Sequence, residues 1–152
     1  MAANAEAICD SFKSEVLSGV HALGTTVIRA GTTKDTIKGA LFTINQSLGK
    51  ATTAYNSTGE VAASGDYSAG GSIVTNANNP SLDGDTAIWT PSASLAWHGV
   101  TFAAFDTLLI YNSTQSNKAI EVLTFGQQQI TSGDFTITMP TNAAATALLQ
   151  LA

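Results

Sequence analysis

The sequence predicts a mainly β protein, a β-sandwich or jelly roll preceded by one N-terminal amphipathic α-helix. Three observations favour this fold class. Apolar residues recur at helical spacing only near the N-terminus, short β-prone runs separated by turn residues fill the chain from Thr36 onward, and helices do not alternate with those runs. We therefore expect a single compact domain, in which residues 1–35 form the helix and a connecting arm and residues 36–152 form the β-sandwich.

The helix is predicted from Ile8, Phe12, Val16 and Val20, which recur every fourth residue and are followed by Gly24 as a stop signal. This spacing places the four side chains on one face of a helix. Two interpretations stay open, because the face could pack on its own domain or dock on a neighbouring subunit.

The remaining chain contains β-prone segments that predict about seven to nine strands. Pro91 should break one segment or confine it to a sheet edge, since proline cannot donate a ladder hydrogen bond. The turn signals Asn79-Pro80 and Asp83-Gly84 predict a surface loop. The segments cover residues 36–44, 71–77, 86–112, 118–125, 134–140 and 145–152.

A β-hairpin is predicted by the stretch "FDTLLIYNSTQSNKAIEVLTF", in which two apolar runs flank a polar insert rich in Asn and Ser. The return strand carries Ile120 and Val122 on one face and Leu123 and Phe125 on the other. Because both faces are apolar, we expect this strand to be central or covered on both sides.

A second turn is expected at Ser132–Asp134, where serine, glycine and aspartate follow one another. After it, Phe135, Ile137 and Met139 should point in one direction. The region would then form a meander of framework strands.

The composition excludes several classes of protein. Charged residues make up only 11% of the chain, against about 25% in typical domains, and such an uncharged polar surface suits packing against other subunits. A net charge of −5 with scattered basic residues argues against nucleic-acid binding. The sequence shows neither a signal peptide nor an apolar run of the roughly 20 residues that cross a bilayer. Cys9 is the only cysteine, which excludes an internal disulfide and favours folding in the cytosol.

No residue set has the spacing of a catalytic, cofactor-binding or metal site. His21 and His98 lie too far apart in the sequence to suggest a zinc site. Asp83–Asp85 with Glu60 or Asp66 could supply oxygen ligands for calcium, but the spacing of a calcium loop is missing, which favours a solvated turn. We therefore predict no enzymatic activity, no cofactor and no metal.

The most distinctive motifs between residues 37 and 140 are framework motifs without a catalytic signature. They are Tyr55 with the run Gly59-Glu60-Val61, the pair Gly70-Gly71, the pair Tyr111-Asn112, and Phe125-Gly126 followed by a "TSGDFT" turn. Together they resemble a group of short structural proteins encoded by tailed bacteriophages. The chain departs from that pattern at Thr124, where the family often has an acidic residue, and at its end "ALLQLA", where the family often has a basic one.

The resemblance implies a virion protein, and we expect a capsid decoration, or cement, protein that binds the outer face of the phage head and stabilises the shell. Its partners would be the phage major capsid protein and copies of itself, most simply a trimer over a local threefold position. It would be synthesised in the host bacterial cytoplasm and located on the capsid surface. The expected contact residues are Ile8, Phe12, Val16, Val20, Leu149 and Leu151.

An alternative is a tail- or fibre-associated β-sandwich that binds host-surface carbohydrate or joins tail components. Aromatic side chains form platforms for sugar rings, and this chain offers Trp89, Trp97, Tyr55, Tyr67 and Tyr111. Trp97 and Tyr111 are expected in the core, whereas Tyr67 is expected to be exposed because glycine and serine surround it.

Overall fold

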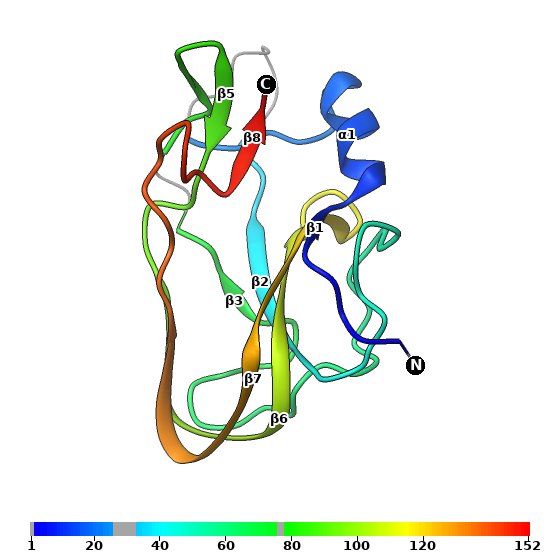
Figure 1. Ribbon diagram of the computed structural model, residues 1–152. Helices are drawn as coiled ribbons and strands as arrows, with labels where there is room; N and C mark the ends of the chain where they lie inside the picture. Colours follow the sequence, from blue (N-terminus) through cyan, green and yellow to red (C-terminus); the bar gives the residue numbers. More distant parts are fainter. Residues whose placement is uncertain (1, 26–32, 76–77) are drawn as a thin grey trace.

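The computed structural model describes residues 2–25, 33–75 and 78–152 and shows a mainly β protein, as the sequence predicts (Figure 1). One antiparallel sheet has the strand order β1-β7-β6-β2-β3, and a smaller one has the order β4-β5-β8. The elements are β1 Ala7–Ile8, α1 Asp10–Leu17, β2 Ile37–Thr43, β3 Ser72–Ile73, β4 Ser81–Asp83, β5 Thr86–Trp89, β6 Leu95–Asn112, β7 Lys118–Ile137 and β8 Leu149–Leu151. Residues 1, 26–32 and 76–77, which belong to the predicted arm and to the strand predicted at 71–77, lie outside the described residues.

The predicted hairpin is confirmed and forms the centre of the larger sheet. Strands β6 and β7 pair over most of their length, and the turn between them contains Ser116 and Asn117 with positive φ angles of 54° and 58°. Neighbouring rows across the sheet point to opposite faces, and Val122 lies in one row while Ile110 lies in the next. Both residues are fully buried, so this part of the sheet is covered on both faces.

The second predicted turn is wrong, because β7 continues through Ser132–Asp134 to Ile137. The pairing with β6 shifts register at several places along this stretch, and Ser132 has a φ angle of 48°. Residues of this stretch that have no partner on β6 therefore form irregularities within one long strand, and the chain does not reverse its direction here. Phe135, Ile137 and Met139 alternate with exposed residues and all pack against the core, so they point in one direction as expected.

The helix is shorter than its apolar spacing predicts. Gly19 ends it, with a φ angle of 66°, well before Gly24. The N–H of Gly19 donates to the carbonyl of Val16 at 3.0 Å, and the N–H of Val20 donates to the carbonyl of Glu15 at 2.9 Å. This pair of bonds satisfies the last carbonyls of α1 with a left-handed glycine, which the sequence analysis overlooked.

The predicted break at Pro91 is confirmed, since Pro91 lies between β5 and β6. The predicted loop around Asp83 is exposed, but part of it forms β4 and pairs with β5. The loop is shorter than expected because the chain reverses tightly at Gly84, whose φ angle is 62°. A face-to-face packing of the two sheets, as in a sandwich or jelly roll, stays a prediction.

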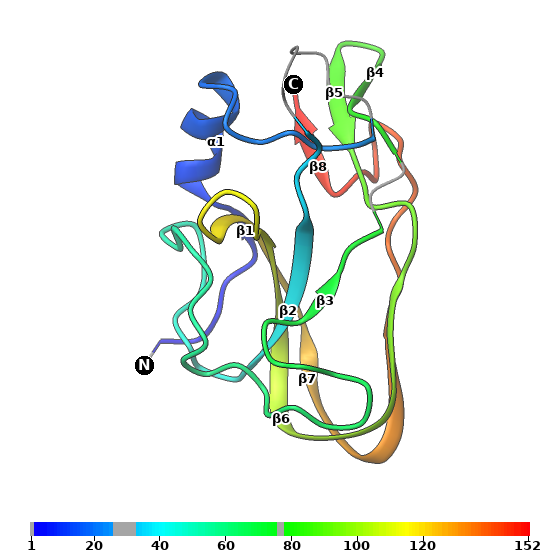
Figure 2. The same cartoon turned by 180° about the vertical axis from the view of Figure 1, so that it is seen from behind.

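The N-terminal segment is part of the larger sheet rather than a separate extension. Strand β1 pairs with β7, and the N–H of Ala5 donates to the carbonyl of Leu48 at 2.8 Å. The side chain of Asn4 donates to Asp106 at 2.9 Å and to the buried hydroxyl of Thr107 at 2.8 Å. Figure 2 shows this segment lying against the long loop that follows β2.

Candidate protein-contact surface

One end of the molecule exposes leucine side chains. The small sheet and the C-terminal end of α1 lie at this end (Figures 1 and 2). Leu17, the last residue of α1, is 91% exposed, Leu82 of β4 is 73% exposed, and Leu151 of β8 is 45% exposed. We call Leu17, Leu82, Ala87 and Leu151 the distal apolar surface. Apolar side chains that gather on a surface mark sites of contact with other molecules.

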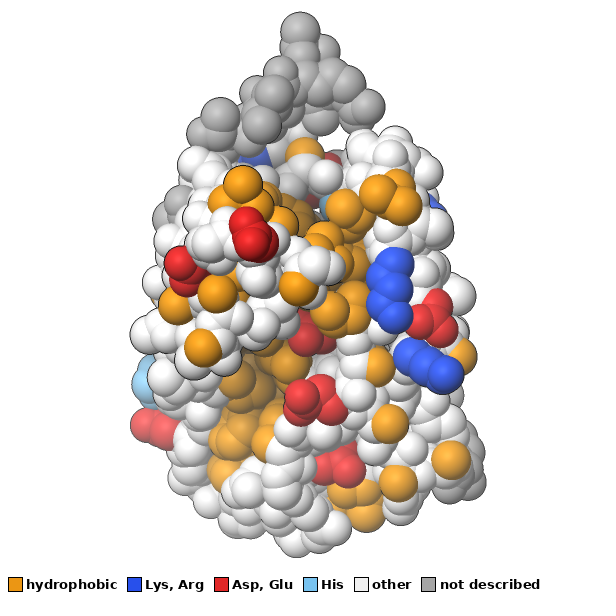
Figure 3. All heavy atoms as spheres, turned by 45° about the horizontal axis from the view of Figure 1, so that its top comes forward, with side chains coloured by type: hydrophobic (Ala, Val, Ile, Leu, Met, Phe, Trp, Pro, Cys, Tyr) orange, Lys and Arg blue, Asp and Glu red, His pale blue; other side chains and the backbone are white. Residues whose placement is uncertain are grey.

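Three members of the distal apolar surface form a stripe across the small sheet. Leu82 pairs with Ala87, and Ala87 pairs with Leu151, so the three side chains share one face. Trp89 and Leu149 each lie two positions further along their strands toward the core. They also pair on this face, and both are buried. The stripe therefore continues a buried apolar row out to the surface, and Figure 3 shows hydrophobic side chains on this end of the molecule.

The apolar face predicted for the helix lies against the chain's own domain. Phe12 is 1% exposed and belongs to the core, and Ile8 and Val16 are partly buried against it. Ile8 lies in β1 rather than in α1, and Val20 follows the helix and is half-buried. Phe12 is thus not presented to a partner in this folded state, and a contact role for the other three stays a prediction.

The two C-terminal candidates differ in their surroundings. Leu149 is buried within the domain, whereas Leu151 lies on the distal apolar surface. Leu17 and Leu82 are exposed although the sequence pattern did not single them out as surface residues. The signal for Leu82 was its place beside the Asp83-Gly84 turn, since an apolar residue next to a tight turn has little chain available to cover it.

The aromatic side chains do not form a platform for sugars. Trp89, Trp97, Tyr67 and Tyr111 are each at most 2% exposed, and Tyr55 is half-buried. The expectation of an exposed Tyr67 is wrong, because its ring packs edge-on against Trp97 at 5.6 Å. The placement of Trp97 and Tyr111 in the core is confirmed.

Several of the framework motifs meet around the carboxylate of Glu60. The hydroxyls of Tyr55 and Tyr67 donate to it at 2.6 and 2.7 Å, and the N–H of Gly70 donates at 2.8 Å. Tyr111 stacks on Tyr55 with ring centroids 4.6 Å apart, and its hydroxyl donates to the carbonyl of Gly70 at 2.6 Å. We call these five residues the Glu60 cluster. It fixes the loop after β2 to the sheet.

Two further contacts complete this attachment. The hydroxyl of Tyr67 also accepts the N–H of Leu41 on β2 at 2.9 Å. Gly71 has a φ angle of 68°, and a Cβ there would lie 2.0 Å from the carbonyl oxygen of Gly39, so only glycine fits. Burial, followed by the nearby charge of Glu60, raises the pKa of Tyr111 to about 12, so its phenol stays protonated at neutral pH. The cluster is therefore structural.

A second polar network attaches the segment after α1 to the β6–β7 turn. Buried Asp35 accepts the N–H of Ala22 at 2.7 Å, the side-chain amide of Asn112 at 2.7 Å and that of Gln115 at 3.1 Å. The Asn112 amide also lies 3.0 Å from Nδ1 of His21. This explains why a polar Asn112 is fully buried at the end of β6.

The same network extends to the helix through His21, whose Nε2 lies 2.9 Å from a carboxylate oxygen of Glu15. The other oxygen of Glu15 accepts a hydrogen bond from Lys118 at the start of β7. Although burial by itself raises the pKa of Glu15, its hydrogen bonds to Lys118 and His21 lower that pKa below the usual range. His21 therefore has a structural environment rather than a metal-binding one.

The described residues hold no group of three or more His, Cys, Asp or Glu side chains placed to bind a metal. His98 and Asp134 form an exposed ion pair at 3.1 Å, and Asp83 accepts the N–H of Ala144 at 2.7 Å. No helix in the described part of the chain is long and apolar enough to cross a membrane. No family model, curated protein or solved structure matches the chain.

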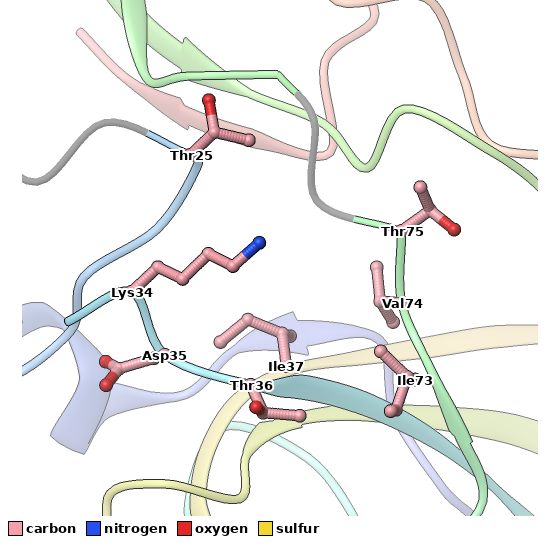
Figure 4. Close-up of a pocket in the computed structure, with 8 residues that line it drawn as sticks. All are labelled: Thr25, Lys34, Asp35, Thr36, Ile37, Ile73, Val74 and Thr75. Atoms are coloured by element: carbon pink, nitrogen blue, oxygen red, sulfur yellow. The ribbon is translucent and has the colours of Figure 1, made fainter.

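A hollow of about 430 Å³ lies beside the edge strand β3 (Figure 4). Ile37, Ile73 and Val74 line one side of it, and the Lys34 side chain extends toward it, whereas Asp35 points away. Ile73 is 64% exposed, so the hollow is open to solvent. It has the character of an uneven surface beside a sheet edge rather than of an enclosed ligand site.

Proposed function

We propose that the chain is a structural protein of a bacteriophage virion that decorates the outer face of the head and stabilises the shell. The observation that carries this proposal is the stripe formed by Leu82, Ala87 and Leu151, with Leu17 exposed at the same end. An uncharged apolar stripe at one end of a small domain suits an end-on contact with another protein. A β-sandwich or jelly-roll packing of the two sheets is part of the proposal.

A cement protein acts by mass action, because it binds the assembled shell in preference to free coat subunits. A contact of a few leucines is weak by itself. Repeated over many sites on a shell, and joined through contacts between neighbouring copies, it becomes strong through avidity. The partners proposed are the major capsid protein and further copies of this chain.

The fold supports this role by holding the contact surface in place. Buried Trp89 and Leu149 anchor β5 and β8 in the core, and the network of Asp35 and Asn112 fixes the segment that follows α1. A surface that is ordered before binding loses less conformational entropy in the complex. The burial of Tyr67 and both tryptophans removes the observation that favoured the carbohydrate-binding alternative.

The test uses heads of the phage that encodes the chain, stripped of this protein, and a variant carrying Leu17→Ser, Leu82→Ser and Leu151→Ser. All three side chains are exposed, so the fold should tolerate the changes. Ile73→Ser is the matched control, because Ile73 is equally apolar and exposed but lies on β3 in the larger sheet.

We expect wild type and Ile73→Ser to co-sediment with the heads and the triple variant to bind at least tenfold more weakly. Equal binding by the triple variant would refute the assignment of the contact surface. Binding of wild type to tails but not to heads would refute the decoration role.

A further inference from the structure

We propose that Glu121 operates a pH-controlled latch for the N-terminal arm, defined as residues 2–9 together with α1. The arm stays on the sheet while the Glu121 carboxyl is protonated and is released when the carboxyl ionises. The inference concerns the monomer and holds whether or not the chain is a virion protein.

The carboxyl of Glu121 is buried beneath the arm. It lies on β7 between Ile8 of β1 and Ile110 of β6, to which it is paired on either side. Glu121 is only 6% exposed, and its Oε2 atom has no hydrogen-bond partner within the described residues. An ionised carboxylate in such a place would have one oxygen, Oε2, with no donor to stabilise it.

Among the described residues of α1 and β7, both lysines near Glu121 are already paired with another carboxylate. Lys13 is paired with Asp10 at 3.0 Å, and Lys118 is paired with Glu15. The elements packed against Glu121 carry the following charged or titratable groups: Glu6 on the arm, Cys9, Asp10, Lys13 and Glu15 in or beside α1, Lys118 and, near its far end, Asp134 on β7, and His98, Asp106 and Tyr111 on β6. Of these, Glu6 adds a repulsive negative charge.

The direction of the pH effect follows from proton linkage. Burial, with a smaller contribution from Glu6, raises the pKa of Glu121 from 4.5 to about 8. Once the arm is released, the carboxyl is solvated and recovers an ordinary pKa. Between these two values the closed form binds more protons than the open form, so rising pH favours opening. The opening constant therefore increases by about tenfold per pH unit between about pH 5 and pH 8 and levels off above that.

We infer that the arm, rather than β6 or β7, moves to relieve the buried charge, against the anchoring of Cys9 and Phe12 in the core. Strand β1 has two residues and lies at the edge of its sheet, whereas β6 and β7 pair with each other over most of their length. The N–H of Cys9 donates to the carbonyl of Ile120 at 3.0 Å, just beyond β1. Short edge elements open locally at lower free energy than central strands do.

Cys9 provides a built-in reporter of arm release. Its side chain is fully buried in the closed form. Burial, together with nearby carboxylates such as Glu121, raises its pKa to about 12, so the closed form reacts slowly with thiol reagents. Labelling therefore measures the open population.

The experiment measures the labelling rate of Cys9 with a disulfide reagent from pH 5.5 to pH 9 in wild type, Glu121→Gln and Asp85→Asn. Glu121→Gln keeps the shape but cannot ionise. Asp85→Asn changes the net charge equally at an exposed position in the distal β4–β5 turn. Each rate is divided by the Glu121→Gln rate at the same pH, which cancels the ionisation of the thiol itself.

We expect this ratio, normalised to its value at pH 5.5, to rise by about tenfold per pH unit up to about pH 8 in wild type and in Asp85→Asn. A ratio that stays constant across the range would overturn the proposal. Hydrogen exchange separates arm release from global unfolding. The amides of Ala7 and Cys9, which face β7, should lose protection as the pH rises, after correction for intrinsic exchange, while those of Leu108 and Leu109 keep it. Parallel loss in both groups would also overturn the proposal.

Discussion

The hydroxyl of Tyr67 makes one buried and one partly buried hydrogen bond, and its removal gives a sharp test of the Glu60 cluster. Tyr67→Phe keeps the ring but deletes the acceptor for the Leu41 N–H and a donor to Glu60. Tyr55→Phe is the matched control, since it deletes a single donor to the same carboxylate from a half-buried ring.

The magnitudes follow from what each deletion leaves without a partner. A buried N–H that loses its acceptor costs about 1–3 kcal/mol, and a hydrogen bond to a charged group contributes about 1.5–3 kcal/mol when fully buried. Since Glu60 is only partly buried, we expect Tyr67→Phe to lower the free energy of unfolding by about 3 kcal/mol. Tyr55→Phe should lower it by about 1 kcal/mol.

Urea unfolding followed by tryptophan fluorescence measures both changes, because Trp97 packs against Tyr67. With a slope of about 2 kcal/mol per molar urea, the midpoint should fall by about 1.5 M for Tyr67→Phe and by about 0.5 M for Tyr55→Phe. Equal shifts, or a larger shift for Tyr55→Phe, would refute the reasoning that the shared hydroxyl of Tyr67 links the loop to β2.

Three further predictions follow from single contacts. Gly71→Ala should lower the free energy of unfolding by about 3 kcal/mol or more, because the new Cβ would clash with the backbone of β2 and residue 71 has a positive φ. Thermal unfolding measures this change, and a melting temperature like that of wild type would contradict the close approach. Phe12→Ala should cost about 3–4 kcal/mol in urea unfolding and Leu17→Ala less than about 0.5 kcal/mol, whereas similar costs would mean that the helix does not pack on its own core. The pKa of His98, measured by NMR titration, should lie above 6.5, because the hydrogen bond to Asp134 stabilises the charged ring. Asp134→Asn should lower this pKa, and an unchanged His98 pKa in that variant would contradict the ion pair.

The sequence predicted correctly those elements for which the apolar pattern and the turn residues indicate the same structure. The β6–β7 hairpin and β2 form where expected, because Asn and Ser residues favour the turn and β-branched or aromatic residues favour the strands. The helix was overextended because the apolar spacing from Ile8 to Val20 continues across Gly19, where the backbone turns left-handed. Spacing alone does not reveal that the first of these residues pairs as a strand.

The site was harder to predict, because burial depends on contacts distant in the sequence. Tyr67 lies among small polar residues in the sequence. In the fold it contacts Leu41 and Trp97, which are both at least 26 positions away along the chain. The role of Asn112 depends on Asp35, 77 residues earlier in the chain. The expectation for Leu149 and Leu151 treated them alike, and strand alternation does place both on one face of β8, but the core covers Leu149 and ends before Leu151.

The central claim is that the chain decorates a phage shell, and its copy number in purified virions tests this most directly. Quantitative mass spectrometry against the major capsid protein of the encoding phage gives the ratio. The proposal predicts about one copy, or a simple fraction such as about one third, per coat subunit, as a site repeated over an icosahedral shell requires. A handful of copies per virion, or none, would contradict the claim.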